Sequence, residues 1–324
     1  MKRWVRGVLA LLLSSMVAPL ALAQGYPSKP IRVIIPSTAG GIIDVLPRAL
    51  FQKMSESMAQ PIVVDNRPGA AGIIGSEMAA KATADGYTLL VVATAHAINP
   101  GLYPKLPYDT EKDFTPITMV GRLPLYLVTH PSVPANNVKE LVALARARPG
   151  QMSFASAGNG QGSHLAGEMF KSLAGIELIH VPYKGAGPAL ADVLAGHASL
   201  LFNDPVSAMP HIKAGRLKLL AVGTAQRSAA VPDTPTVAES GVPGFDAYAW
   251  LGILAPAGLP TDIAAKLHRE IIKAMNAPEI KERFFSASGG IEPIGANPEQ
   301  SVVFIRSEMT KWAKVVKDAG VKGD

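Results

Sequence analysis

The sequence predicts an α/β protein made of two α/β lobes with a ligand cleft between them. Strands and helices alternate over residues 31–93, and the alternation restarts over residues 152–223. In each half the first strand runs into a glycine-rich loop that opens a helix, at 36–44 and again at 157–162. Such alternation produces parallel sheets covered by helices, and ligands bind beyond the carboxyl ends of their strands. We therefore expect the two loops to face one cleft.

The first half has three expected strands, each short, rich in β-branched residues and bounded by turn residues. They cover residues 31–36, 61–65 and 87–93. Helical periodicity places helices between them at 45–58 and 73–83. Pro47 is expected in the first turn of the first helix, where its missing N–H costs little.

A second run of elements follows an extended stretch at 117–130. Asn137 and Glu140 have the spacing of a capping box and predict a helix that ends at 149–150. Ser163 is the expected N-cap of a helix at 164–174. The remaining strands are expected at 152–156, 177–183, 199–203 and 217–223. The remaining helices are expected at 187–196 and 205–214.

The C-terminal part combines an apolar, strand-like run at 247–254 with two amphipathic helices. Apolar residues recur at helical spacing over 263–275 and 302–316, and Asn297-Pro298 is a typical helix start. These helices are expected to cover the sheet of the first lobe.

This arrangement requires the chain to cross between the lobes near 121–127 and again near 244–250. We therefore assign residues 24–123 plus 247–324 to lobe one and residues 124–246 to lobe two.

The first 23 residues have the pattern of a secretory signal peptide, with a basic start, a short apolar run and a cleavage site after Ala23. The run is short for a membrane span, which needs ~20 apolar residues. Without this segment the chain has 28 basic and 25 acidic residues, and this small net positive charge gives no indication of nucleic-acid binding. The chain has no cysteine, so packing rather than disulfides must hold it together. We expect a soluble monomer in the periplasm.

The loop at 36–44 favours a small anion as its ligand. A strand, a glycine loop and a helix start together present free backbone N–H groups and the positive end of a helix dipole. The loop lacks the Lys-Ser/Thr ending of a P-loop and the G-x-G-x-x-G spacing of a dinucleotide site. A carboxylate held by backbone groups is therefore the first interpretation.

The residue types that suggest catalysis or metal binding have simpler interpretations here. Ser163 is not surrounded by G-x-S-x-G, and Asp44 in the first turn of a helix is favourable through the helix dipole alone. The seven histidines show no zinc-ligand spacing. Tyr248 and Trp250 are expected to pack under the second crossing rather than to stack on a ligand. The sequence thus predicts neither an active site nor a metal or cofactor.

Nine segments in order along the chain carry a resemblance to a known family. They are YPSKPIR at 26–32, PIVVDNRPG at 61–69, ADGYT at 84–88, HAINPGLYPKLPYD at 96–109, ASAGNGQGSH at 155–164, HVPYKGAGPA at 180–189, PHIKAG at 210–215, PDTPTVAE at 232–239 and KWAKVVK at 311–317. With them the chain resembles the Bug-type (TctC-like) extracytoplasmic solute-binding proteins of tripartite tricarboxylate transporters. The resemblance implies a type II periplasmic binding fold of the Venus-flytrap kind, without catalysis.

The resemblance also implies which residues hold the ligand, a small solute that often carries carboxylates. In lobe one they are Ser37, Thr38, Ala39, Gly40, Gly41 and Asp44, and in lobe two Ser156, Ala157, Gly158 and Ser163. Thr94, Ala95 and His96 and the turn Asn203-Asp204 are implied to line the rest of the pocket.

The first loop departs from the family pattern, since Ser37 stands where an aromatic residue is usual and Ile43 where a small hydroxyl residue is common. This departure predicts a roomier, less polar pocket mouth, suited to a longer or aromatic carboxylate.

The expected partner is the membrane permease of such a transporter. A periplasmic receptor for a signalling system is the alternative that the sequence leaves open, and a periplasmic hydrolase is a third.

Overall fold

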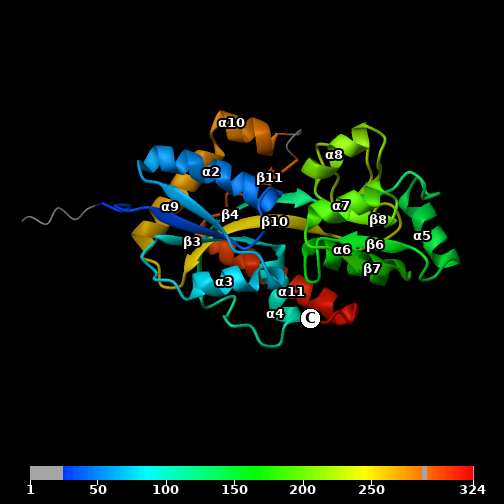
Figure 1. The fold of residues 1–324 in the computed structure, drawn as a ribbon, viewed down its shortest axis with the longest axis horizontal. Coiled ribbons are helices and arrows are strands. Elements are labelled where there is room, and N and C mark those ends of the chain that lie inside the picture. Colours follow the sequence, from blue (N-terminus) through cyan, green and yellow to red (C-terminus); the bar gives the residue numbers. More distant parts are fainter. Residues whose placement is uncertain (1–24, 287–289, 324) are drawn as a thin grey trace, which may run out of the picture.

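The computed structural model describes residues 25–286 and 290–323, so the expected signal peptide at 1–23 lies outside the described residues. The described residues form a six-stranded sheet and a five-stranded sheet, each covered by helices. Figure 1 shows the two sheets next to each other along the long axis of the molecule, which gives lobe one and lobe two. The predicted α/β architecture with two lobes is confirmed.

The sheet of lobe one has the strand order β11-β4-β10-β3-β1-β2. Its strands are β1 (Ile31–Ile35), β2 (Ile62–Asn66), β3 (Thr88–Ala93), β4 (Phe114–Pro124), β10 (Tyr248–Pro256) and β11 (Glu292–Pro293). β1 pairs in parallel with β2 and β3, whereas β10 is antiparallel to both β3 and β4. The three N-terminal strands were all predicted.

Helices cover both faces of this sheet. They are α2 (Ile42–Met58), α3 (Ile73–Ala80), α4 (Thr94–Leu102), α9 (Thr261–Met275), the short α10 (Pro278–Ile280) and α11 (Pro298–Asp318), with a 3₁₀ turn at Ala70–Gly72 and a π turn at Lys281–Phe285. Side chains of β1 alternate between the faces, since Val33 packs in the cluster under α2 and α9 and Ile34 in the opposite cluster.

α2 begins at Ile42, three residues before the expected start at 45, so the helix opens directly from the glycine loop. Pro47 therefore lies in the second turn, and the expectation of a first-turn position is wrong. Because proline has no N–H, the carbonyl of Ile43 has no partner of the usual helical kind.

The sheet of lobe two has the strand order β7-β6-β8-β5-β9. Its strands are β5 (Tyr126–Thr129), β6 (Ser153–Ser156), β7 (Ile179–Pro182), β8 (Leu200–Asn203) and β9 (Lys218–Val222), and its helices are α5 (Val138–Ala147), α6 (Gly162–Ala174), α7 (Ala186–Leu194) and α8 (Pro205–Lys213). β6 is parallel to β7 and β8, and β5 is antiparallel to its two neighbours. Each of these strands and helices overlaps a predicted one.

Two predicted helix starts are capped as the sequence indicates. Asn137 accepts the Glu140 N–H over 2.9 Å at the start of α5, and the Glu140 carboxylate accepts the N–H of Asn136 over 2.8 Å. Asn297 and Gln300 form a reciprocal capping box at the start of α11.

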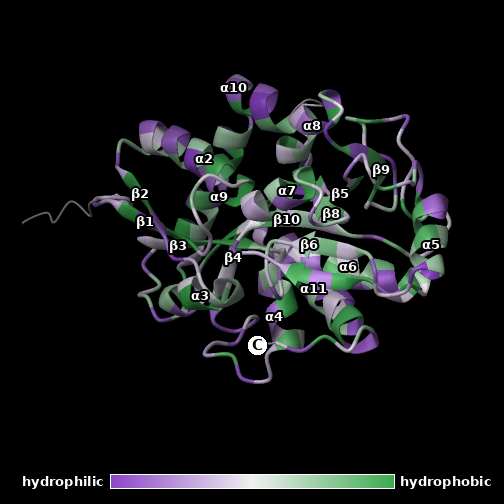
Figure 2. Ribbon diagram, turned by 45° about the vertical axis from the view of Figure 1, so that its right-hand side comes forward, coloured by the Kyte–Doolittle hydropathy of each residue, from purple (hydrophilic) through white to green (hydrophobic). Residues whose placement is uncertain are grey.

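One apolar cluster continues from lobe one into lobe two. It joins Trp250 and Trp312 of lobe one to Phe154 and Phe202 of lobe two, all of them fully buried. α11 contacts α4 and β4 of lobe one and also α6 of lobe two. Figure 2 shows hydrophobic strands in the middle of the molecule and hydrophilic residues on outer helices such as α2 and α5.

The chain passes from one sheet to the other at two adjacent places. β4 ends at Pro124 and β5 begins at Tyr126, so only Leu125 separates the two sheets. The return passes through Ala247, just before β10, and Gly223 hydrogen-bonds to both crossings. The lobe limits at 24–123 plus 247–324 and at 124–246 stay a prediction.

Changing Gly167 to alanine is expected to destabilise the protein by about 1–3 kcal/mol, because overpacking forces neighbours to shift. A Cβ on Gly167 in α6 would lie 2.2 Å from the Phe154 ring. Urea denaturation measures the loss. Gly187→Ala in α7 is the matched control, since its Cβ would meet nothing within 4 Å. That variant should be neutral or stabilised by about 0.5–1 kcal/mol, and equal stability of the two variants would contradict the prediction.

Candidate functional site

The loop between β1 and α2 leaves the start of the helix without a side-chain cap. Gly41 is the N-cap residue and offers no side-chain acceptor. Gly40 before it has a φ of +91°, a conformation that glycine adopts without steric cost. Thr38, Ala39, Gly40 and Gly41 are exposed. The N–H groups at the start of α2 and the positive end of its dipole are therefore accessible to an anion.

Asp44 holds this loop from behind with a buried carboxylate. Oδ2 accepts the Gly40 N–H over 3.0 Å, and Oδ1 accepts Arg48 Nε over 2.8 Å and Asn66 Nδ2 over 2.9 Å. Burial alone would raise the pKa of Asp44, but the hydrogen bonds from Arg48, Gly40 and Asn66 outweigh it and hold the pKa below its usual range. Asn66 also donates to the Ser37 carbonyl over 3.0 Å. Asp44 thus orients the loop.

The second glycine loop, between β6 and α6, is built in a similar way. α6 begins at Gly162 with Gln161 as its N-cap residue, and no side chain caps it. The expectation that Ser163 is the N-cap is wrong, because the helix starts at Gly162, two residues before the expected start at 164. Ser163 Oγ instead accepts the N–H of Ala157 over 3.0 Å and folds the loop back on the helix. The N–H groups at the start of α6 therefore have no side-chain cap, like those at the start of α2.

Ser156 supports this loop from inside. It is fully buried, and its Oγ accepts the Gly158 N–H over 3.2 Å and lies 2.6 Å from His180 Nε2. A serine and a histidine at this distance resemble part of a nucleophilic pair. The Ser156 hydroxyl has no accessible surface from which to attack a substrate.

Two stacked histidines lie behind the same loop. The rings of His164 and His180 are 3.9 Å apart and almost parallel, and Phe154 stacks on His180 at 4.8 Å. His164 Nδ1 accepts the Gly160 N–H over 3.2 Å. His164 Nε2 lies 3.9 Å from the Glu168 carboxylate. The stack and the His164–Gly160 hydrogen bond therefore support the shape of the loop.

The structure brings the starts of α4 and α6 together between the lobes. An ideal Cβ on Gly162 would lie 3.5 Å from Thr94 Cβ, and one on Gly185 would lie 4.0 Å from Thr38 Oγ1. A Cβ on Gly160 would lie 2.9 Å from Leu102. Residues of both predicted loops are thus next to the opposite lobe.

Thr94, Ala95 and His96 form the first turn of α4 and are buried. Thr94 Oγ1 accepts the N–H of Trp250 over 3.3 Å. His96 lies against Phe114 at 5.1 Å between ring centres, and its ring nitrogens have no partner among the described residues. Burial lowers the pKa of His96 to about 4. His96 is therefore a neutral core histidine.

Asn203 and Asp204 form the cap of α8. Asp204 accepts the Ser207 N–H over 2.9 Å and the Ser207 hydroxyl over 2.6 Å, and Asn203 donates to the same hydroxyl over 2.8 Å. Their polar atoms thus serve this helix start.

Sequence reasoning missed Gly185, Ala71 and Leu102, which lie at the contact between the lobes. Gly185 follows a strand end, as Gly40 and Gly158 do, and this signal could have identified it. Ala71 and Leu102 carry no chemical signal, since only the folded chain brings them to Gly160.

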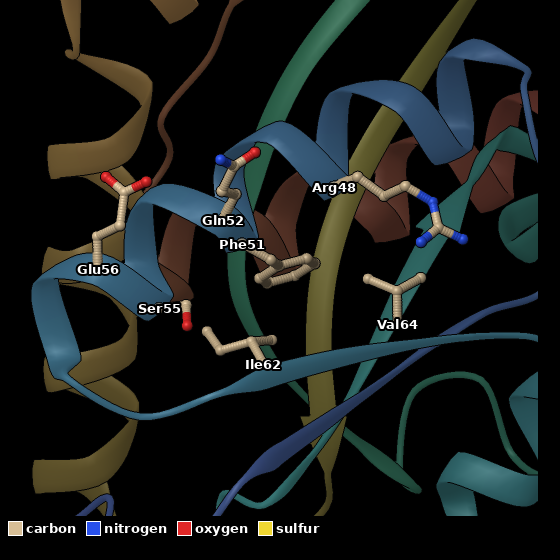
Figure 3. Close-up of a pocket in the computed structure, with 7 residues that line it drawn as sticks. All are labelled: Arg48, Phe51, Gln52, Ser55, Glu56, Ile62 and Val64. Atoms are coloured by element: carbon tan, nitrogen blue, oxygen red, sulfur yellow. The ribbon is translucent and has the colours of Figure 1, made fainter.

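A surface pocket of about 330 Å³ lies elsewhere, between α2 and β2, and Figure 3 shows its lining. It is lined by Arg48, Phe51, Gln52, Ser55, Glu56, Ile62 and Val64, none of which was predicted as a site residue. Among residues 25–286 and 290–323, no group of three or more His, Asp or Glu side chains could hold a metal ion. In the same ranges, every helix is too short or too polar to cross a membrane.

Comparison with known proteins places the chain in a family. Residues 46–321 match the family described as the tripartite tricarboxylate transporter family receptor, TctC. The chain is 38% identical to protein BugT of Bordetella pertussis over 95% of its own length and 94% of BugT.

Two solved structures with bound carboxylates are similar over most of the chain. Rpa4515 of R. palustris with adipate has a TM-score of 0.86 and 34% identity, covering 92% of this chain and 99% of Rpa4515. MatC from Rhodopseudomonas palustris with bound malate has a TM-score of 0.82 and 29% identity, covering 90% of this chain and all of MatC. The predicted periplasmic binding fold is confirmed, and the chain belongs to the receptor family of the tripartite tricarboxylate transporters.

Proposed function

We propose that the protein captures a small carboxylate-bearing solute between its lobes and delivers it to the permease of a tripartite tricarboxylate transporter. The observation that carries the proposal is the pair of glycine loops at the uncapped starts of α2 and α6. The proximity of Thr38 to Gly185 and of Thr94 to Gly162 of lobe two supports a shared site. The adipate and malate bound by two similar proteins support a carboxylate.

Backbone groups can hold a carboxylate without an arginine. A buried carboxylate is costly unless its oxygens are hydrogen-bonded. Two helix starts offer several N–H donors and two positive dipole ends. Arg48, the cation next to the first loop, already pairs with Asp44 at 2.8 Å. The ligand therefore supplies the negative charge and the protein supplies preorganised dipoles.

The implied site residues take different roles in this proposal. Thr38, Ala39, Gly40 and Gly41 contact the ligand from lobe one together with Ser37 and Thr94, and Ala157, Gly158 and Ser163 contact it from lobe two. Asp44 and Ser156 hold the two loops in place through the hydrogen bonds described above, and Asn203 and Asp204 cap α8. Ala95 and His96 stay in the core.

A ligand that touches both loops links the lobes physically. It binds the closed arrangement better than an open one and shifts the population toward closure. We propose that the protein works in this way in the periplasm, after cleavage behind Ala23, and without a catalytic step. The burial of Ser156 supports the absence of catalysis at the one Ser–His pair described above.

Isothermal titration calorimetry with adipate, malate, citrate and benzoate tests the ligand class. We expect at least one of these carboxylates to bind with a micromolar or lower Kd, and the neutral diol 1,6-hexanediol not to bind. The longer or aromatic acids should bind more tightly than citrate, because Ser37 leaves more room than an aromatic residue would. Failure of all four acids would contradict the carboxylate proposal, and tight citrate binding alone would contradict the roomier mouth.

A Gly41→Leu variant tests the role of the first loop. The backbone of Gly41 is extended, and an added Cβ would meet nothing within 4 Å, so the fold should tolerate leucine. The side chain would stand in front of the N–H groups of α2 and should weaken carboxylate binding by at least tenfold. Gly25→Leu, which also has open space around the new Cβ, is the control and should bind normally. Unchanged affinity in Gly41→Leu would place the ligand elsewhere.

An Asp44→Asn variant should be less stable than the wild type by about 1–3 kcal/mol at pH 7, because an amide cannot accept all the hydrogen bonds of the carboxylate. The pKa of Asp44 is lowered in the folded protein. Its contribution is therefore complete above the unfolded pKa of about 3.9 and is lost as the pH falls through the folded value.

Urea denaturation between pH 7 and pH 3 should show the gap between wild type and Asp44→Asn closing at the acid end. Asp233→Asn, at an exposed position, is the control and should follow the wild type. A gap that stays constant down to pH 3 would contradict the assigned role of the carboxylate.

A further inference from the structure

Glu308 on α11 is a buried carboxylate that collects donors from two elements. Oε1 accepts the Tyr248 hydroxyl over 2.7 Å, and Oε2 accepts the indole N–H groups of Trp250 over 2.8 Å and of Trp312 over 3.0 Å. Lys311 Nζ lies 2.7 Å from Oε1. Burial and the adjacent Glu308 carboxylate raise the pKa of Tyr248, which keeps its hydroxyl protonated as a donor. Only 2% of Glu308 is exposed.

These donors lie next to a crossing between the lobes. Tyr248 is the first residue of β10 and pairs with Pro124, the last residue of β4 before Leu125. The helix that carries Glu308 contacts α6 of lobe two as well as α4 and β4 of lobe one. Figure 1 shows α11 beneath β10 where the two lobes meet. Glu308 thus ties the last helix to the strand that enters from lobe two.

A second set of contacts leads from this cluster to the ligand site. The side chain of Trp250 is held by Glu308, and its backbone N–H donates to Thr94 Oγ1 over 3.3 Å. Thr94 faces Gly162 at the start of α6. A hydroxyl has one hydrogen and two lone pairs. Because Trp250 uses the Thr94 oxygen as an acceptor, the hydroxyl hydrogen is left for an acceptor atom on the other side.

We propose that Glu308 is a positioning residue for the ligand site. Through Trp250 it sets the place of Thr94 beside Gly162, so that the Thr94 hydroxyl donates to an oxygen of the ligand. This inference rests on the proposed function for its last step, the donation to a carboxylate. The link from Glu308 to Thr94 needs no ligand.

A carboxylate at position 308 is not needed to fill space, since buried ion pairs often add no stability over apolar side chains of similar volume. What the carboxylate adds is direction. Two indole N–H groups and a phenol hydroxyl must all point at its two oxygens. The Trp250 side chain is oriented in this way, and the backbone N–H of the same residue holds Thr94.

A double-mutant cycle tests the link without a ligand. The stabilities of Glu308→Gln, Thr94→Val and the double variant are measured by urea denaturation. If the two residues belong to one network, their effects on the free energy of unfolding are not additive. We expect Glu308→Gln to raise the unfolding equilibrium constant in the wild type, and to raise it by a factor at least five times smaller in the Thr94→Val background. In the control cycle, Ser301→Ala replaces Thr94→Val. Ser301 is a buried serine of α11 whose hydroxyl accepts the Met119 N–H, and its effect on stability should be additive with that of Glu308→Gln. Additivity in both cycles would overturn the proposal.

Adipate titration tests the effect on the site. The chain has three tryptophans, of which Trp4 lies in the expected signal peptide, so mature emission comes from Trp250 and Trp312 and can follow binding. We expect Glu308→Gln and Thr94→Val each to raise the adipate Kd at least tenfold, and the double variant to raise it no further.

Thr94→Ser keeps the hydroxyl and should retain wild-type affinity for adipate, and so should Ser301→Ala. Wild-type affinity in Glu308→Gln would overturn the positioning role. If the wild type binds no carboxylate, the proposed function fails, and the double-mutant cycle still decides whether Glu308 positions Thr94.

Discussion

The arrangement of the two lobes depends on one close approach of backbone at Gly223. Its N–H donates to the Leu125 carbonyl over 2.7 Å, and its carbonyl accepts the Ala247 N–H over 2.8 Å. A Cβ here would lie 2.6 Å from the Ala247 oxygen, so the position admits glycine alone. Both crossings are therefore held side by side, and the loops that open α2 and α6 are presented to the same space. The two loops can form one site only because this junction holds the two lobes in this relative position.

Much of the fold could be predicted because its signals are local. β-branched runs identified β1, β2 and β3. Asn297-Pro298 marked the start of α11, and Asn137 with Glu140 three residues later marked the start of α5. The position of β10 between β3 and β4 could not be read from the sequence, since pairing between distant strands leaves no local pattern. The early start of α2 was missed because Ile42 and Ile43 were read as part of the loop rather than as the first helical turn.

The parts of the site formed by glycine loops were predictable from the sequence. The positions of residues that depend on tertiary contacts were not. The loops at 36–41 and 157–162 meet the opposite lobe through Thr38 and Gly162. His96 is in the core rather than at the ligand because Tyr108 and Phe114, from a later segment, pack against its ring. Asp204-Pro205 is a typical cap and first helical residue, and this signal could have shown that Asp204 serves α8. Trp312 is one helical turn from Glu308, but Tyr248 and Trp250 come from a strand so distant in sequence that no local pattern connects them to it.

The place of β10 also has a consequence for the order of assembly. All five strands of lobe two lie between residues 126 and 222, so that sheet can close as soon as this segment is available. The sheet of lobe one cannot, because β10 at 248–256 fills the gap between β3 and β4. Contacts between such distant segments form slowly. The edge of β3 that pairs with β10 must therefore stay uncovered until the chain is available as far as residue 256.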